Sequence, residues 1–226
     1  MSDRAAFPPL IFIMPGIITV DLHHQVLPHW ENCRAPLPMP PMVITLDFHT
    51  DTLDCRRRLP DMPENCAAAV NILHHDEHFD WALRRNIISR AVIIAVSPCA
   101  ILPEHPALEV RRHPELPEMH DILNSPEKFR PLAEMFLDDR FLAPLLPGGV
   151  PAEPYILDID CDYIMCRKAL RPEQSSLIRS LAENALLITI SRENDWVKLL
   201  RLPQEDISGS VIAGELLPLL KPSGSR

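Results

Sequence analysis

The stretch VITLDFHTD, residues 43–51, carries the clearest information about the fold. It begins as a short apolar, β-branched run, which is typical of a strand buried on both faces of a parallel sheet. Asp47, His49 and Asp51 then follow at alternate positions, and an extended chain places alternate side chains on one face. The stretch therefore predicts a buried strand whose carboxyl end presents two carboxylates and an imidazole.

Similar apolar runs occur elsewhere, at 17–20, 91–96, 155–159 and 186–190. Segments with helical spacing lie between them, at 64–73, 77–88, 127–136 and 173–186, and Pro172 suits the first turn of the last one. Strands that alternate with helices imply right-handed crossovers between parallel strands. We therefore expect an α/β fold, a three-layer α/β/α sandwich with a mainly parallel sheet, in which functional groups collect at the carboxyl ends of the strands.

The composition limits the classes of function. The 226 residues suit one domain, expected to span 1–226 with a flexible polar tail at 221–226. A net charge of -9 argues against nucleic acid or an anionic membrane as a partner. The sequence has neither an apolar stretch long enough to span a membrane nor the features of a signal peptide, so we expect a cytoplasmic protein.

Cysteine and proline add two local expectations. The six cysteines show no CxxC spacing, and we interpret them as reduced thiols that fill space in the interior. The 25 prolines are concentrated in part at 36–41 and 103–117. Because proline restricts φ and lacks a backbone donor, these two segments are predicted to be extended surface loops.

A second acidic stretch, YILDIDCD at residues 155–162, repeats the pattern of an apolar strand that gains carboxylates towards its end. Asp158, Asp160 and Asp162 project to the same side, and their mutual repulsion in a partly dry site requires protons or metal ions. Together the two stretches supply hard oxygen ligands and an imidazole, which suit Mn²⁺ and, less specifically, Mg²⁺, Zn²⁺ or Fe²⁺. The alternative for residues 47–51 is a polar turn with helix-capping aspartates.

A DxHxD strand end followed much later by a strand-borne DxD resembles the paired signature of the arginase, agmatinase and formiminoglutamase superfamily, the ureohydrolases, whose fold is arginase/deacetylase-like. The resemblance implies a binuclear manganese centre. It implies that Asp47 and Asp160 bridge the two ions, that His49 and Asp162 bind one of them, and that Asp51 binds the other.

The second motif departs from the family pattern DxDxxDP, because its proline is missing and Asp158 offers a competing register. Asp160 belongs to the metal-binding pair in either register. We favour Asp160 with Asp162, because ligands lie at the carboxyl end of a strand and because Asp158 falls where the family usually has serine.

The resemblance also implies a histidine ligand from an earlier loop, and the segment VDLHHQVLP, residues 20–28, lies in the corresponding place. His23 is the first choice and His24 the alternative. The segment is similar to the pattern VEDHxxVLP of a compact, divergent branch of the superfamily. That branch includes the peptide arginases of ribosomal-peptide biosynthesis, which convert arginine side chains of a precursor peptide to ornithine.

Hydrolysis of a guanidinium also needs a proton donor and a substrate anion. We take His78 as the candidate donor, although it could simply belong to the first turn of a helix that Asp76 and Glu77 open. Glu193, after the last predicted strand, is the candidate anion, with Asp195 as its neighbouring alternative. A solvated charged turn at 192–195 is the structural alternative for both.

The predicted function is therefore hydrolysis of a guanidino group with release of urea. The first expected substrate is arginine within a precursor peptide, followed by free arginine or agmatine. A metal-stabilised binding protein without catalytic activity is the non-enzymatic alternative. The spacing of single-zinc deacetylases and the signatures of metallophosphoesterases are absent from the sequence. The oligomeric state is left open, a homo-oligomer included.

Overall fold

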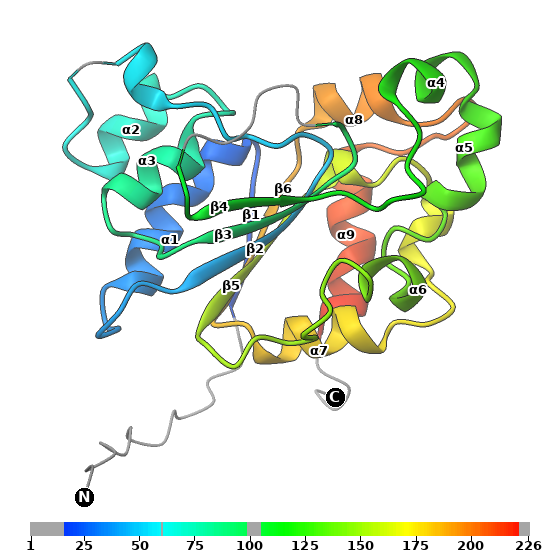
Figure 1. Cartoon of the computed structure of the whole chain (residues 1–226). Coiled ribbons are helices and arrows are strands. Elements are labelled where there is room, and N and C mark those ends of the chain that lie inside the picture. The colour runs from blue at the N-terminus through cyan, green and yellow to red at the C-terminus, as the bar shows by residue number, and fades with distance from the viewer. Residues whose placement is uncertain (1–15, 60, 99–104, 222–226) are drawn as a thin grey trace, which may run out of the picture.

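The strands of the central sheet all run parallel (Figure 1). The computed structural model describes residues 16–59, 61–98 and 105–221. Within them the sheet has the order β1-β6-β5-β2-β3-β4. The strands are β1 Gly16–Val20, β2 Met42–Asp47, β3 Ala91–Ala95, β4 Leu108–Arg111, β5 Tyr155–Asp160 and β6 Leu187–Ser191. The predicted strands are present, and the two that carry the acidic motifs, β2 and β5, are neighbours near the centre.

Helices cover both faces of the sheet (Figure 1). One face is covered by α1 Leu27–Arg34, α2 Cys66–Ile72 and α3 His78–Arg84, with the short 3₁₀ helices His23–Val26 and Cys55–Arg57. The other face is covered by α4 Met119–Asn124, α5 Pro126–Ala133, α6 Asp139–Leu142, α7 Ser176–Asn184, α8 Asn194–Leu200 and α9 Gly209–Leu220, with the 3₁₀ helices Cys161–Tyr163 and Arg167–Leu170. The expectation of a three-layer α/β/α sandwich is confirmed.

Alternate strand residues enter two separate hydrophobic cores. Val43 and Ile156 pack with Trp30 of α1 on one face, whereas Leu46 and Leu157 belong to the core on the other face. This alternation is the pleat of a strand buried on both sides. It places Asp158 and Asp160, two and four residues after Ile156, on the face that α1 and α3 cover.

Two expectations about local structure were wrong, and several helices were not predicted. The proline-rich segment 103–117 contains a strand, β4, since Leu108–Arg111 has no proline and can pair along β3. The predicted helix at 173–186 begins only at Ser176, so Pro172 lies before its first turn. Helices α1, α4, α6, α8 and α9 were not predicted, and α9 continues through Pro218 close to its end.

The remaining expectations concern membrane spans, cysteines, the polar tail, the location of the protein and its domain boundary. None of the helices in the described part of the chain is long and apolar enough to cross a membrane. Cys33, Cys55, Cys66, Cys161 and Cys166 are free thiols, and four of these are buried, as expected of thiols that fill space. Most of the predicted tail, 222–226, lies outside the described residues, and the cytoplasmic location and the single-domain boundary stay predictions.

Candidate metal centre and adjoining pocket

The carboxylates of the two acidic motifs meet at the carboxyl edge of the sheet. Leu46 of β2 pairs with Ile159 of β5, and each strand ends one residue later in an aspartate. Asp47 and Asp160 therefore emerge side by side from adjacent strands. Both are almost completely buried, as is Asp162 in the 3₁₀ helix that follows β5.

His23 lies in the middle of these carboxylates. It follows β1 at the start of a 3₁₀ helix and has no exposed surface. Its Nδ1 atom is 3.1 Å from Asp51 Oδ2, 3.2 Å from Asp160 Oδ2 and 3.5 Å from Asp47 Oδ2. His24, the alternative ligand, is also buried, but its Nδ1 has no hydrogen-bond partner within the described residues. The geometry thus favours His23 over His24.

His49 contacts the cluster beside Asp162, and its side chain is partly exposed. Its Nδ1 lies 3.0 Å from Asp162 Oδ2 and 4.0 Å from Asp47 Oδ1. Backbone N–H groups hold these carboxylates in place: His49 donates to Asp47 Oδ1 at 2.7 Å and Phe48 donates to Asp162 Oδ1 at 3.2 Å. These backbone hydrogen bonds hold the carboxyl groups of Asp47 and Asp162 close to the His49 ring.

The predicted ligands form overlapping groups of metal-binding size. His23, Asp47 and Asp160 offer ligand atoms within 4.8 Å of one another, and so do Asp47, His49 and Asp162. Asp47 belongs to both groups. A third group on the same scale joins His23 and Asp51 with His78. One carboxylate shared between two sets of ligands can hold two cations close together, as two-metal hydrolytic sites do.

The electrostatics of the cluster favour a bound cation. Burial and the neighbouring carboxylates, Asp51 and Asp162 first, raise the pKa of Asp47 well above its usual range. Burial and then Asp162 raise the pKa of Asp160 in the same way. Oδ2 of Asp47 is buried without a hydrogen-bond partner within the described residues, and Oδ2 of Asp162 is buried with only the His49 ring nitrogen beside it at 3.0 Å. Hard oxygen donors with unused lone pairs, together with two imidazoles, fit divalent ions such as Mn²⁺.

The backbone at two site residues lies in the left-handed region. Asp51 has φ of 46° and Glu193 has φ of 37°. Non-glycine residues in this region are strained by about 1 to 3 kcal/mol and cluster at functional sites. Both side chains point into the same region of the molecule, since each contacts His23.

Asp158 makes contacts of a different kind from those of Asp160. Its Oδ2 lies 2.7 Å from His23 Nε2 and accepts the Thr45 hydroxyl at 2.8 Å, while Oδ1 accepts the Thr189 hydroxyl at 2.5 Å. It therefore contacts the ring nitrogen of His23 opposite to the one that faces Asp160. The geometry favours the register with Asp160 and Asp162 as the pair of ligands.

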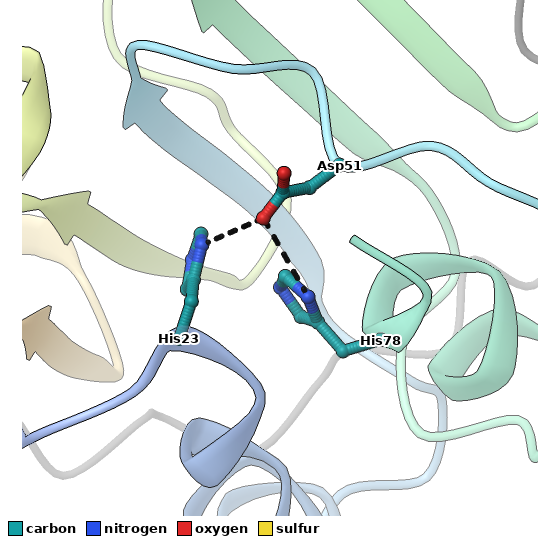
Figure 2. A group of neighbouring side chains, drawn as sticks. All are labelled: His23, Asp51 and His78. Atoms are coloured by element: carbon teal, nitrogen blue, oxygen red, sulfur yellow. Dashed lines mark hydrogen bonds and ion pairs between the residues drawn. The ribbon is translucent and has the colours of Figure 1, made fainter. Parts of the chain in front are cut away.

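His78 lies behind the cluster and not at its surface. Figure 2 shows His23 and His78 both directed at Asp51, whose Oδ2 is 3.9 Å from Nδ1 of His78. The same Nδ1 donates to the carbonyl of His75 at 2.7 Å, and Nε2 has no partner within the described residues. Burial and the neighbouring His23 lower the pKa of His78 well below its usual value. The ring is fully buried.

Glu193 lies between β6 and α8 and is 5% exposed. Its Oε1 accepts the backbone N–H of His23 at 2.6 Å, and burial raises the pKa of its carboxyl group. Asp195, the alternative anion, is exposed to solvent. Glu193 is thus the acidic group of this segment that adjoins the predicted metal ligands.

A pocket of about 340 Å³ opens beside the cluster. His49 and Asp51 line one part of it, and His75, Asp76 and Trp196 line another. The ring of Trp196 is 4.8 Å from that of His49 and 5.8 Å from that of His75, measured between centroids. The sequence had given no role to His75 or Trp196. The signal available there was only a histidine pair shortly before the predicted helix at 77–88 and a single tryptophan after the last predicted strand.

Comparison with solved structures places this architecture among known folds. The chain superposes on the proclavaminate amidino hydrolase from Streptomyces clavuligerus with a TM-score of 0.52 and 15% sequence identity, covering 92% of this chain and 62% of that one. The two chains share a fold. At this identity the likeness establishes the fold alone.

Two further structures give weaker matches. A hypothetical agmatinase from Burkholderia thailandensis has a TM-score of 0.48 and 17% identity, covering 91% of this chain and 59% of that one. An arginase from Medicago truncatula has a TM-score of 0.47 and 14% identity, covering 90% and 57%. The chain thus spans less than two thirds of each of these three proteins. No protein-family model matches the chain, and neither does any curated protein sequence.

Proposed function

We propose that this protein is a metal-dependent hydrolase of guanidino groups, a compact ureohydrolase with two Mn²⁺ ions. The observation that carries the proposal is the pair of ligand groups joined by Asp47 at the carboxyl ends of β2 and β5. The shared fold with an amidino hydrolase supports it.

The ligand assignment follows the resemblance and the contacts of the side chains. His23 and Asp51 would hold one ion, and His49 and Asp162 the other. Asp47 and Asp160 would bridge the two. The close approach of His23 Nδ1 to Asp51 and of His49 Nδ1 to Asp162 supports this division. When bound, such a pair of ions supplies Lewis-acid activation of water for attack on the guanidinium carbon.

Glu193 would bind the guanidinium of the substrate. A buried cation needs an anion beside it, because the loss of hydration otherwise exceeds the energy of its contacts. Glu193 is nearly buried and lies against the backbone of a metal ligand, which supports this role. Trp196, on the wall of the pocket, would offer its ring face to the same cation.

The proton for the leaving amine would come from a histidine beside the pocket. His78 is the candidate from the sequence, and the structure adds His75. His75 lines the pocket, whereas His78 is buried and its Nδ1 is occupied by the His75 carbonyl. A general acid must reach the group that it protonates. We therefore favour His75 as the donor, with His78 as the alternative.

The proposed substrate is an arginine side chain within a precursor peptide, which would be converted to ornithine with release of urea. The support for a peptide is the resemblance of residues 20–28 to the peptide-arginase branch. The pocket volume of about 340 Å³ suits a single side chain better than a large ligand. Free arginine and agmatine are the alternative substrates, and a non-catalytic metal-binding protein is the alternative of another class.

The decisive experiment combines metal analysis with product analysis. Purified protein would be loaded with Mn²⁺ and incubated with free arginine, agmatine and an arginine-containing peptide. We expect two ions per chain, urea in solution and a product lighter by CN₂H₂ on mass spectrometry. A preference for the free amino acid would contradict the peptide proposal. Two bound ions with no urea from any of these substrates would favour the binding protein.

A further inference from the structure

We infer that Asp158 is a positioning residue that holds the Nε2–H of His23 and thereby directs Nδ1 at the metal centre. The inference rests on one part of the proposed function, the presence of a metal ion beside Nδ1 of His23. The contact itself belongs to the chain, because Asp158 Oδ2 and His23 Nε2 are 2.7 Å apart and both side chains are buried. The opposite nitrogen, Nδ1, faces Asp51 and Asp160.

The hydrogen bonds around Asp158 determine which group donates. Trp30 Nε1–H, which can only donate, reaches Thr189 Oγ1 at 3.2 Å. Thr189 then uses its own proton to donate to Asp158 Oδ1, and Thr45 donates to Oδ2. Asp158 therefore acts as an acceptor at both oxygens. His23 consequently presents a proton at Nε2 and keeps the Nδ1 lone pair for a metal.

Asp158 and the three residues of its hydrogen-bond chain, Thr45, Thr189 and Trp30, lie on four different elements, which makes the arrangement rigid. Thr45 is on β2, Thr189 is on β6, and Asp158 itself is on β5 between them. Trp30 reaches the group from α1 and is fully buried. A histidine ligand held in this way has one ring orientation and one tautomer, and a carboxylate partner makes it a stronger ligand.

The competing explanation is that Asp158 binds the metal directly. Its position argues against this, since two threonine hydroxyls and the His23 N–H already occupy its oxygens. A direct ligand and a positioning residue also predict different results on substitution. Loss of a ligand removes an ion from the site, whereas loss of the positioning carboxylate weakens binding and keeps the number of ions.

The test uses the full chain, stripped of metal and titrated with Mn²⁺ by calorimetry. We expect Asp158→Asn to retain two sites and to lose roughly 10- to 100-fold in the affinity of one. Asp138→Asn is the matched control, because Asp138 is an equally buried aspartate that pairs with Arg140 instead. It should bind Mn²⁺ as the wild type does. Unchanged affinity in Asp158→Asn, or the loss of one ion, would overturn the inference.

A second measurement is independent of metal uptake. In the metal-free chain with ¹⁵N-labelled histidine, the His23 Nε2–H should give a downfield proton resonance protected from exchange. Asp158→Asn should shift it upfield and expose it to exchange. Thr189→Val, which removes one donor to Asp158 without touching His23, should move it less and serves as the milder variant if Asp158→Asn fails to fold. A resonance unchanged in both variants would refute the contact. A wild type with this resonance but without Mn²⁺ binding would refute the proposed function alone.

Discussion

The backbone N–H of His23 donates to Oε1 of Glu193 at 2.6 Å, and both residues are buried. This hydrogen bond connects the segment after β1 with the segment after β6, which are neighbouring strands. It places the proposed substrate anion in direct contact with a proposed metal ligand. Metal binding is therefore expected to depend on His23 and substrate binding on Glu193, two residues in contact whose effects can be separated by substitution.

Glu193→Gln is expected to keep both metals and lose substrate affinity. Glutamine retains an oxygen that can accept the His23 N–H, but it lacks the charge that a guanidinium needs. Loss of a buried charge partner costs roughly 2 to 5 kcal/mol. Substrate affinity can be measured with agmatine in a calorimeter, and the metal content by atomic emission. Asp195→Asn is the control because Asp195 is exposed, and equal affinities in the two variants would contradict the assignment.

Asp47→Ala and Asp160→Ala are each expected to abolish turnover and to leave fewer than two ions per chain. Asp47 belongs to both groups of ligands and Asp160 to the group with His23, and the resemblance to the ureohydrolases implies that both carboxylates bridge the two ions. Metal content after gel filtration, with urea release in parallel, checks this. Two ions per chain in either variant would show that the bridging assignment is incorrect.

Asp162→Ala and Asp158→Ser separate the two possible registers. Asp162 adjoins His49, so its loss should remove activity altogether. Asp158→Ser removes only the carboxylate behind His23, and measurable activity should remain at a high Mn²⁺ concentration. Urea release at increasing Mn²⁺ is the measurement. The opposite ranking of the two variants would assign the ligand pair to Asp158 and Asp160.

Added Mn²⁺ is expected to stabilise the folded chain. An ion that binds only the folded state contributes about 2.7 kcal/mol for each such site at a concentration 100 times its Kd. Thermal unfolding with and without Mn²⁺ should therefore show a higher Tm with the metal. Asp138→Asn should keep this increase and Asp160→Ala should lose most of it. An unchanged Tm in the wild type over a wide range of Mn²⁺ would argue against a preformed site.

His75→Asn is expected to lower kcat by roughly 10²- to 10⁴-fold, the usual contribution of a general acid, while metal content is unchanged. Added imidazole should restore part of the activity, because His75 lines an open pocket. The His78 ring, by contrast, is fully buried, and its centroid lies 4.3 Å from that of the His23 ring. Because His23 is a proposed metal ligand, His78→Asn should act mainly on the affinity for Mn²⁺. Steady-state kinetics with matched metal analysis distinguishes the two. A loss of kcat in His78→Asn alone, with metal retained, would restore His78 as the donor.

The strands that appear in the sequence as short apolar runs could be predicted. The strand at 43–46 and the strand at 155–159 are short, apolar and β-branched, and each became a buried parallel strand. The strand at Leu108–Arg111 was not predicted, because its Leu-Glu-Val-Arg sequence is half polar and lies among prolines. It forms a strand because the exposed edge of β3 offers backbone partners, which is a property of the assembled sheet.

The sequence by itself determined the ligand types and their spacing, because alternation along a strand is a local property of two adjacent peptide units. It placed Asp47, His49 and Asp51 near one strand end and Asp160 with Asp162 near another. The strands stop at Asp47 and Asp160, however, so the positions of the three later residues come from the turn after β2 and the 3₁₀ helix after β5 and not from strand alternation. Only the tertiary structure decided that β5 lies beside β2, which brings these two ends together. It also decided that Asp158 faces Nε2 of His23 and that His75 and Trp196 line the pocket. Such contacts join residues far apart in the chain, and the packing of the two cores, not any local preference, selects them.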